Sequence, residues 1–182
     1  MMLGSAAVDS ALADLKAALE EKTMETRSFI YTTYIDAPPE LVWRALTDPA
    51  FTRRYWNMEF ETDWTPGSRF TSIQTNSGLR ISDEEVVVKE YEPFERLSYA
   101  WEAYPQEMVG TFSQDYVDKA AREPRSTATF ELFPSGTQTR LVVTHSGFQP
   151  DSVVLPAISE GWPWVLSGLK TLLESDRWQE VA

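Results

Sequence analysis

The clearest periodic pattern of apolar residues lies near the C-terminal end of the chain. Apolar positions recur there at the spacing of one helix face, and they predict a helix several turns long: Ile158, Trp162, Val165, Leu166, Leu169, Leu172 and Leu173. Pro163 falls early in this pattern, where it either occupies the first turn or kinks the start of the helix. A long single apolar stripe indicates a helix that lies on a sheet.

Two alternating segments before this helix predict a hairpin. Residues 127–133 and 139–147 flank the turn signal Pro134-Ser135-Gly136. Alternate residues of a strand point to the same side of a sheet. The buried side is therefore expected to carry Ala128, Phe130, Leu132, Leu141, Val143 and His145.

Three earlier segments, 69–75, 81–91 and 96–103, predict a meander. In the last segment Leu97, Tyr99 and Trp101 share one face. Ser98 and Glu102 are expected on the opposite, solvent-facing side. The sheet is therefore predicted to have one buried and one exposed face.

The first strand is predicted from Phe29 to Ile35, and it stops at two consecutive prolines. Residues 41–46 predict a short helix, and Asp48 followed by Pro49 predicts the cap and first turn of another. Between 104 and 124 the alternation breaks, and 114–122 predicts a short helix. We interpret this segment as a lid or as a cover for the sheet edge.

A further amphipathic helix is predicted ahead of the first strand. Val8, Leu12, Leu15 and Leu19 recur at helical spacing, with charged residues on the other faces. Three outcomes are open: the apolar stripe packs on the domain, the helix frays as part of the terminus, or the stripe contacts a second copy or another protein.

Several local strings resemble those of one known family. They are Ile35-Asp36-Ala37-Pro38-Pro39-Glu40-Leu41-Val42-Trp43 with Leu46-Thr47-Asp48-Pro49, Tyr91-Glu92-Pro93-Phe94-Glu95-Arg96-Leu97-Ser98-Tyr99, Val143-Thr144-His145-Ser146-Gly147-Phe148, and Gly161-Trp162-Pro163 with the leucines that follow. Together with the order of elements, these strings resemble the START-like (SRPBCC) superfamily, in the branch of homologues of the activator of the heat-shock-protein ATPase.

The resemblance implies an α+β helix-grip fold, in which a curved antiparallel sheet wraps around a long C-terminal helix. It covers about residues 26–175 and implies two parts: an N-terminal helical extension at 1–25 and a START-like domain at 26–178. The segment 104–124 departs from the family pattern and is interpreted as an insertion.

The same resemblance implies three kinds of function. Most relatives bind lipids, polyketides or other apolar molecules, a few catalyse cyclisation or dehydration, and one eukaryotic group stimulates a chaperone. Fold alone does not separate these functions. We rank binding of a small hydrophobic molecule first, a polyketide cyclase- or dehydrase-like enzyme second, and a chaperone-associated or self-associating interaction module third.

The composition of the chain argues against several classes of binding partner. The formal charge of −12 at pH 7 disfavours nucleic acid and anionic membrane surfaces. No apolar run is long enough to span a bilayer, which takes about 18 residues or more. Cysteine is absent, and no phosphate-binding loop, histidine-rich metal spacing or nucleophile elbow occurs. The sequence predicts a cytoplasmic protein without a metal or cofactor, with an apolar ligand and a homodimer as candidate partners.

A cavity between the sheet and the C-terminal helix is the expected ligand site, although the same aromatic residues also fit a solid core. The candidate lining comprises Tyr31, Trp56, Phe70, Tyr99, Trp101, Met108, Phe112, Phe130, His145, Trp162 and Leu169. Of these, Tyr31, Tyr99 and His145 are the candidate polar groups that orient the ligand.

His145 is the only histidine, and two roles are open to it. Its ordinary pKa lies near neutrality, which suits a general acid or base, and we keep it as a weak candidate for that role. The alternative is a buried imidazole whose nitrogens are hydrogen-bonded inside the core. No triad partner lies beside it in the sequence.

Overall fold

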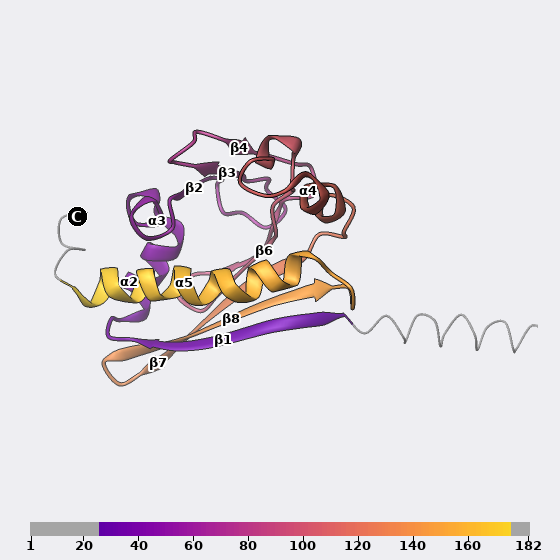
Figure 1. Ribbon diagram of the computed structural model, residues 1–182. Coiled ribbons are helices and arrows are strands. Elements are labelled where there is room, and N and C mark those ends of the chain that lie inside the picture. The colour runs from indigo at the N-terminus through magenta and orange to yellow at the C-terminus, as the bar shows by residue number, and fades with distance from the viewer. Residues whose placement is uncertain (1–25, 176–182) are drawn as a thin grey trace, which may run out of the picture.

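The computed structural model describes residues 26–175 (Figure 1). The predicted helix at Val8–Leu19 lies outside these residues, as does the end of the domain predicted to reach residue 178. The elements in chain order are β1 (Arg27–Ile35), α2 (Pro39–Thr47), α3 (Pro49–Tyr55), β2 (Met58–Glu61), β3 (Thr71–Gln74), β4 (Arg80–Ile81), β5 (Val88–Glu92), β6 (Arg96–Ala100), the 3₁₀-helix η1 (Gln106–Met108), α4 (Gln114–Ala120), β7 (Thr127–Ser135), β8 (Gln138–Phe148) and α5 (Val154–Glu174).

The main sheet is antiparallel and five-stranded, in the order β1-β8-β7-β6-β5. The first strand lies at one edge, where Tyr31 is opposite Val143 of β8. The predicted hairpin is confirmed, since β7 pairs with β8 with Phe130 opposite Val143. Its six predicted inward residues, Ala128, Phe130, Leu132, Leu141, Val143 and His145, are all buried.

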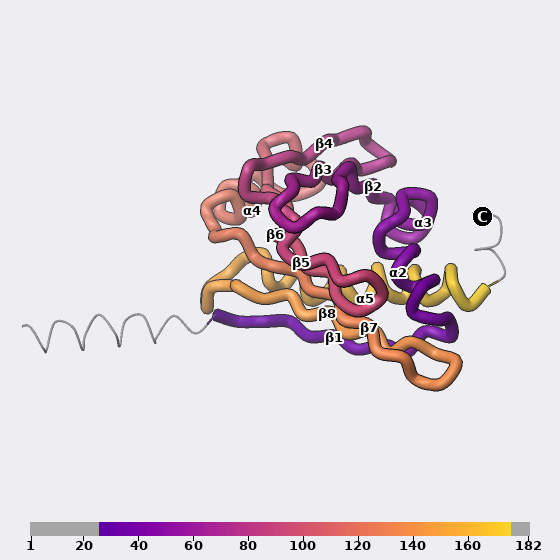
Figure 2. The backbone as a smooth tube through the Cα atoms, turned by 180° about the vertical axis from the view of Figure 1, so that it is seen from behind, coloured from indigo at the N-terminus to yellow at the C-terminus, as the bar shows by residue number. Residues whose placement is uncertain are grey.

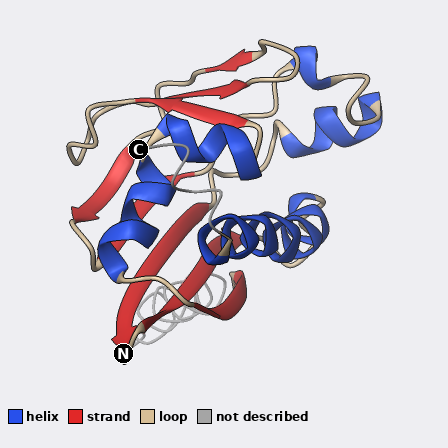
Figure 3. Cartoon of the chain, turned by 90° about the vertical axis from the view of Figure 1, so that its left-hand side faces the viewer, coloured by secondary structure: helices blue, strands red, loops and turns tan. Residues whose placement is uncertain are grey.

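Helix α5 crosses one face of this sheet (Figures 1 and 3). The predicted apolar stripe is confirmed, and its members are buried: Ile158, Trp162, Val165, Leu166, Leu169, Leu172 and Leu173. The predicted position of Pro163 in the first turn is wrong, because the helix begins at Val154 and Pro163 lies in its interior. A proline in a helix interior removes one backbone hydrogen bond, and the helix continues through Pro163 with its apolar stripe buried on both sides of it.

The two short helices after β1 are confirmed. Pro39 opens α2, and Pro49 opens α3. The Asp48 side chain accepts a hydrogen bond from the Ala50 N–H at 2.9 Å, as expected of an N-cap. Together these helices close one end of the sheet (Figure 2).

The predicted meander differs from the structure in one strand. The segment 81–91 is not one strand, because β4 and β5 belong to different sheets. A second sheet has the order β2-β3-β4, and β2, at Met58–Glu61, was not predicted. A turn over Asp83–Glu85, held by Asp83 accepting from the Glu85 N–H at 2.8 Å, separates the two strands. Figure 3 shows this smaller sheet on the far side of α5 from the five-stranded sheet.

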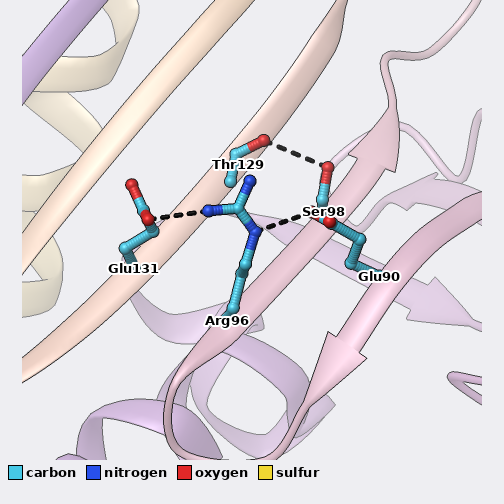
Figure 4. Close-up of polar contacts among 5 residues, drawn as sticks. All are labelled: Glu90, Arg96, Ser98, Thr129 and Glu131. Carbon is cyan, nitrogen blue, oxygen red and sulfur yellow. Dashed lines mark hydrogen bonds and ion pairs between the residues drawn. The ribbon is translucent and has the colours of Figure 1, made fainter.

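The outer face of the five-stranded sheet carries a cross-strand polar network (Figure 4). Arg96 of β6 pairs with Glu90 of β5 and Glu131 of β7, each at 2.7 Å. Beside them the Ser98 and Thr129 hydroxyls lie 3.0 Å apart. The prediction that Ser98 faces solvent is wrong, because its side chain is buried.

The segment 104–124 contains η1 and α4, the second of which confirms the predicted short helix. Phe112 and Tyr116 stack with their ring centroids 4.7 Å apart, and Tyr104 packs against both. Met108 is buried. The segment therefore has its own aromatic cluster, which packs against the domain.

These elements form the predicted α+β helix-grip fold, with a curved antiparallel sheet around a long C-terminal helix. Within residues 26–175, no helix has the length and apolar character needed to cross a membrane.

Candidate ligand cavity

A cavity of about 220 Å³ lies between α5, the end of β6 and the segment 104–124. Most of its lining is aromatic or aliphatic. The residues are Trp56, Gln74, Trp101, Glu102, Tyr104, Met108, Thr111, Phe112, Ala157, Ile158, Gly161, Trp162 and Val165. Gly161 leaves room here, because a Cβ atom added to it would meet no atom within 4 Å.

Three tryptophans from separate parts of the chain form one wall. Trp162 of α5 lies 5.3 Å from Trp56 and 5.4 Å from Trp101, measured between ring centroids. Trp56 and Trp101 are stacked at 6.4 Å. The contacts are tilted, edge-on or offset, which are the geometries that aromatic pairs prefer. The wall is therefore a packed, preformed surface.

A smaller cavity of about 50 Å³ lies beside the first. Its lining comprises Trp56, Met58, Phe60, Phe70, Ser72, Tyr99, Trp101 and Glu102. Trp56, Trp101 and Glu102 thus contribute to both cavities. The Glu102 carboxyl is the one acidic group in either lining.

Burial raises the pKa of Glu102 from 4.5 to about 7. The Ser72 hydroxyl lies close enough to oppose this rise, but its effect is smaller. Glu102 is partly accessible because it lines the cavities, yet protein surrounds it closely enough to penalise the charged form. The prediction that Glu102 faces solvent is wrong. The strand β6 ends at Ala100, so the alternation of faces does not continue to residue 102.

His145 lies behind the tryptophan wall and is fully buried. Its Nδ1 accepts from the Trp162 indole N–H at 3.0 Å, and its Nε2 lies 2.9 Å from the Ser126 hydroxyl. Burial lowers its pKa from 6.5 to about 3. An acid or base must reach the ligand's proton, and this imidazole lines neither cavity. Its position matches the alternative of a hydrogen-bonded core residue.

The structure brings together part of the predicted lining. Trp56, Trp101, Met108, Phe112 and Trp162 line the larger cavity, and Phe70 and Tyr99 line the smaller one. Phe130 and Leu169 are buried in the core behind the cavity walls. Tyr31 of β1 stacks on Phe29 at 6.4 Å and lines neither cavity.

Sequence reasoning missed Glu102 and several other polar residues of the lining. Gln74, Tyr104 and Thr111 are polar lining residues in loops or at strand ends, where a period of two gives no guide. Glu102 did carry a signal, because it is a charged residue between Trp101 and Tyr104.

A hollow of about 480 Å³ also lies between α3 and α5. Its lining includes Arg54, Ser167 and Thr171, and Trp164 at its rim is 64% exposed. We do not assign it as the ligand site, because its lining is mainly polar or small, with Trp164 and Leu172 as the larger apolar side chains. Across residues 26–175, no cluster of three or more His, Cys, Asp or Glu side chains is arranged to hold a metal ion.

The helix-grip fold and the cavity beneath α5 define a domain of the START-like superfamily. The chain belongs to the family described as activator of Hsp90 ATPase homolog 1-like protein, whose model matches residues 36–174. This match confirms the resemblance seen in the sequence. Family and fold together support a ligand-binding domain in general terms. Among curated proteins, none matches the chain with statistical significance.

Solved structures of similar fold come from several bacteria. The protein MLL2253 from Mesorhizobium loti is 30% identical, with a TM-score of 0.63 over 81% of this chain and 97% of that one. CalU16 from Micromonospora echinospora is 22% identical, with a TM-score of 0.57 over 86% of this chain and 81% of that one. The Aha1 dimer from Colwellia psychrerythraea is 19% identical, with a TM-score of 0.59 over 81% and 96%. The last two similarities concern the fold alone.

Proposed function

We propose that this protein binds a small hydrophobic molecule, such as a lipid, a polyketide-like compound or an aromatic compound, in the cavity between the sheet and α5. The observation that carries the proposal is the lining of that cavity, where three tryptophans face a mainly apolar space that contains one carboxyl group. Ligand sites are typically concave and apolar, with a few polar groups that fix orientation.

The volume of the cavity limits the size of the ligand. An engineered apolar cavity of about 150 Å³ is enough to bind benzene. A cavity of about 220 Å³ therefore accommodates one or two rings or a short acyl chain. A longer ligand requires more room, and movement of the segment 104–124, which supplies Met108 and Phe112 to the lining, would provide it. The interpretation of that segment as a lid or as a cover for the sheet edge stays a prediction.

The other two functions have less support from the described residues. A cyclase- or dehydrase-like reaction through His145 needs that imidazole in the cavity, and it is fully buried with both nitrogens hydrogen-bonded. Self-association or docking through the N-terminal helix stays a prediction, because that helix lies outside the described residues.

Native mass spectrometry of the purified protein, followed by denaturing extraction, tests the proposal. A reproducible apolar adduct, or saturable binding of a fluorescent apolar probe, is the expected result. Gly161→Leu should abolish binding, because a side chain at this position enters the cavity. Glu160→Leu is the matched control, since Glu160 is the exposed neighbour on the same helix.

Binding that survives Gly161→Leu would place the ligand elsewhere. Absence of both an adduct and probe binding in the unaltered protein would contradict the cavity proposal.

A further inference from the structure

Glu102 is the polar group that best distinguishes this cavity from an apolar core. It lies where the two cavities meet, and it lines both. Among the described lining residues of either cavity there is no lysine, arginine or histidine that could serve as a counter-ion. The carboxyl forms no ion pair with any residue in the range 26–175.

Two further polar atoms near Glu102 are buried without a hydrogen-bond partner. They are the Tyr99 hydroxyl and the Trp101 indole Nε1. Trp101 adjoins Glu102 in the chain, and Tyr99 is near enough for the carboxyl to affect its pKa. The Trp101 N–H also lies close enough to the Tyr104 hydroxyl to lower the pKa of that group, although it does not reach hydrogen-bond geometry.

Unpartnered buried donors are costly. Leaving one unsatisfied destabilises a fold by about 1–3 kcal/mol, so they are rare and often lie at functional sites. The wall next to Glu102 therefore combines a carboxyl with no partner charge and side chains whose N–H and O–H groups are unused.

We propose that the Glu102 carboxyl donates a hydrogen bond to the carbonyl oxygen of a small, neutral, largely apolar ligand in the larger cavity. A carbonyl oxygen has two lone pairs and no proton of its own. It therefore matches a wall whose unused groups are donors. This inference rests on the proposed function and adds to it the chemical class of the ligand.

Charged ligands fit this wall less well. An anion would meet the Glu102 carboxyl without a lysine or arginine in the lining, in a protein of formal charge −12. A cation would be attracted by the tryptophan faces and by an ionised Glu102, but it would leave the Trp101 N–H and the Tyr99 hydroxyl without an acceptor. A neutral carbonyl compound meets neither obstacle.

The proposed hydrogen bond requires a protonated Glu102. Burial keeps the pKa of this group near 7, so its protonated fraction falls as pH rises through neutrality. Affinity for a carbonyl ligand should fall over the same range.

The ionisable groups near Glu102 come from several segments. Tyr99 and Tyr104 interact with it electrostatically. Glu123 and Arg125 line a minor hollow that Glu102 shares. Arg125 is paired with Asp83 and Glu85, while Glu123 accepts hydrogen bonds from Ser152 and from the Val153 N–H. His145 lies behind Trp101, with ring centroids 4.8 Å apart.

A pair of ligands with the same shape tests the inference. Acetophenone and α-methylstyrene differ in having C=O or C=CH₂ at one position. Titration is followed through the NMR signal of the Trp101 indole N–H, at pH 6 and at pH 8.5. We expect the unaltered protein to prefer the ketone about fivefold at pH 6, which is the effect of one net hydrogen bond, and to lose most of this preference at pH 8.5.

Two variants separate the role of the proton from that of the shape. Glu102→Gln keeps an N–H donor at every pH, so its preference for the ketone should persist at pH 8.5. Glu102→Met lacks a donor and should show no preference at either pH. If Glu102→Met does not fold, the comparison between the unaltered protein and Glu102→Gln still tests the inference.

Equal affinity for the two ligands at pH 6 would overturn the inference and leave the cavity proposal intact. Tighter binding of phenyltrimethylammonium, with affinity that rises with pH, would overturn it in favour of a cation site. Failure of both uncharged ligands to bind would overturn this inference, while the proposed function would still be decided by the adduct and by binding of the apolar probe.

Discussion

The indole N–H of Trp162 on α5 donates a hydrogen bond to Nδ1 of His145 on β8 over 3.0 Å. Because Nδ1 accepts, the proton of the neutral imidazole lies on Nε2, which donates to the Ser126 hydroxyl at 2.9 Å. His145 of β8 thus connects α5 to the loop residue that precedes β7, and its tautomer follows from its neighbours.

The His145 imidazole should not titrate in the folded protein between pH 5 and pH 8, because burial lowers its pKa to about 3. The unfolded chain takes up this proton near pH 6.5, so this group lowers stability as the pH falls below 6.5, by about 1.4 kcal/mol per pH unit. NMR of the ring nitrogens against pH checks this. A midpoint between 6 and 7 would show that the imidazole reaches water.

Trp162→Phe should destabilise the protein by about 1–3 kcal/mol, since it leaves His145 Nδ1 buried without a donor. Trp164→Phe on the same helix is the control, because Trp164 is 64% exposed and its loss should change stability by less than about 0.5 kcal/mol. Urea denaturation measures both. Equal effects would mean that the hydrogen bond contributes nothing.

Glu102→Gln should change the pH dependence of stability. Burial raises the pKa of the Glu102 carboxyl in the folded protein. The contribution of this group to the free energy of unfolding is therefore complete below pH 4.5 and is lost as the pH rises to about 7. Glutamine has no proton to lose, so the variant should gain about 3 kcal/mol relative to the parent between pH 4 and pH 8. Denaturation curves at both pH values test this, with exposed Glu107→Gln as the control. Parallel pH profiles for parent and variant would argue against a buried carboxyl.

Two glycines of α5 should respond differently to alanine. Gly161→Ala should raise stability by about 1 kcal/mol, because alanine favours helix and the added methyl meets no atom within 4 Å. At Gly168 the methyl would lie 3.2 Å from the Tyr55 carbonyl oxygen, so Gly168→Ala should gain nothing or destabilise. Chemical denaturation distinguishes the two. A gain at both positions would show that α3 moves away from α5 at little cost.

Much of the fold was predictable because burial imposes periods that the sequence displays. The stripe from Ile158 to Leu173 and the alternation in 127–133 both follow from a side chain's position relative to the core. The division of 81–91 between two sheets was not predictable, because it depends on a local turn in which the Asp83 side chain accepts from the Glu85 N–H and the Asp83 carbonyl accepts from the Val86 N–H.

The site was less predictable than the fold. Aromatic residues such as Trp101 were found because they belong to apolar patterns. Glu102 was placed on the wrong side because the strand ends two residues earlier, at Ala100. The residue at which a strand ends depends on the neighbouring strand that pairs with it. A single sequence does not show which strands are neighbours.

The pairing of β1 with β8 has a consequence for synthesis on the ribosome. Ile35 pairs with Thr139, more than a hundred residues later in the chain. Contacts that are distant in sequence form slowly. The first strand therefore leaves the ribosome without a partner and stays unpaired until most of the chain has been translated. Over that interval its apolar residues and its unpaired backbone groups are exposed to aggregation.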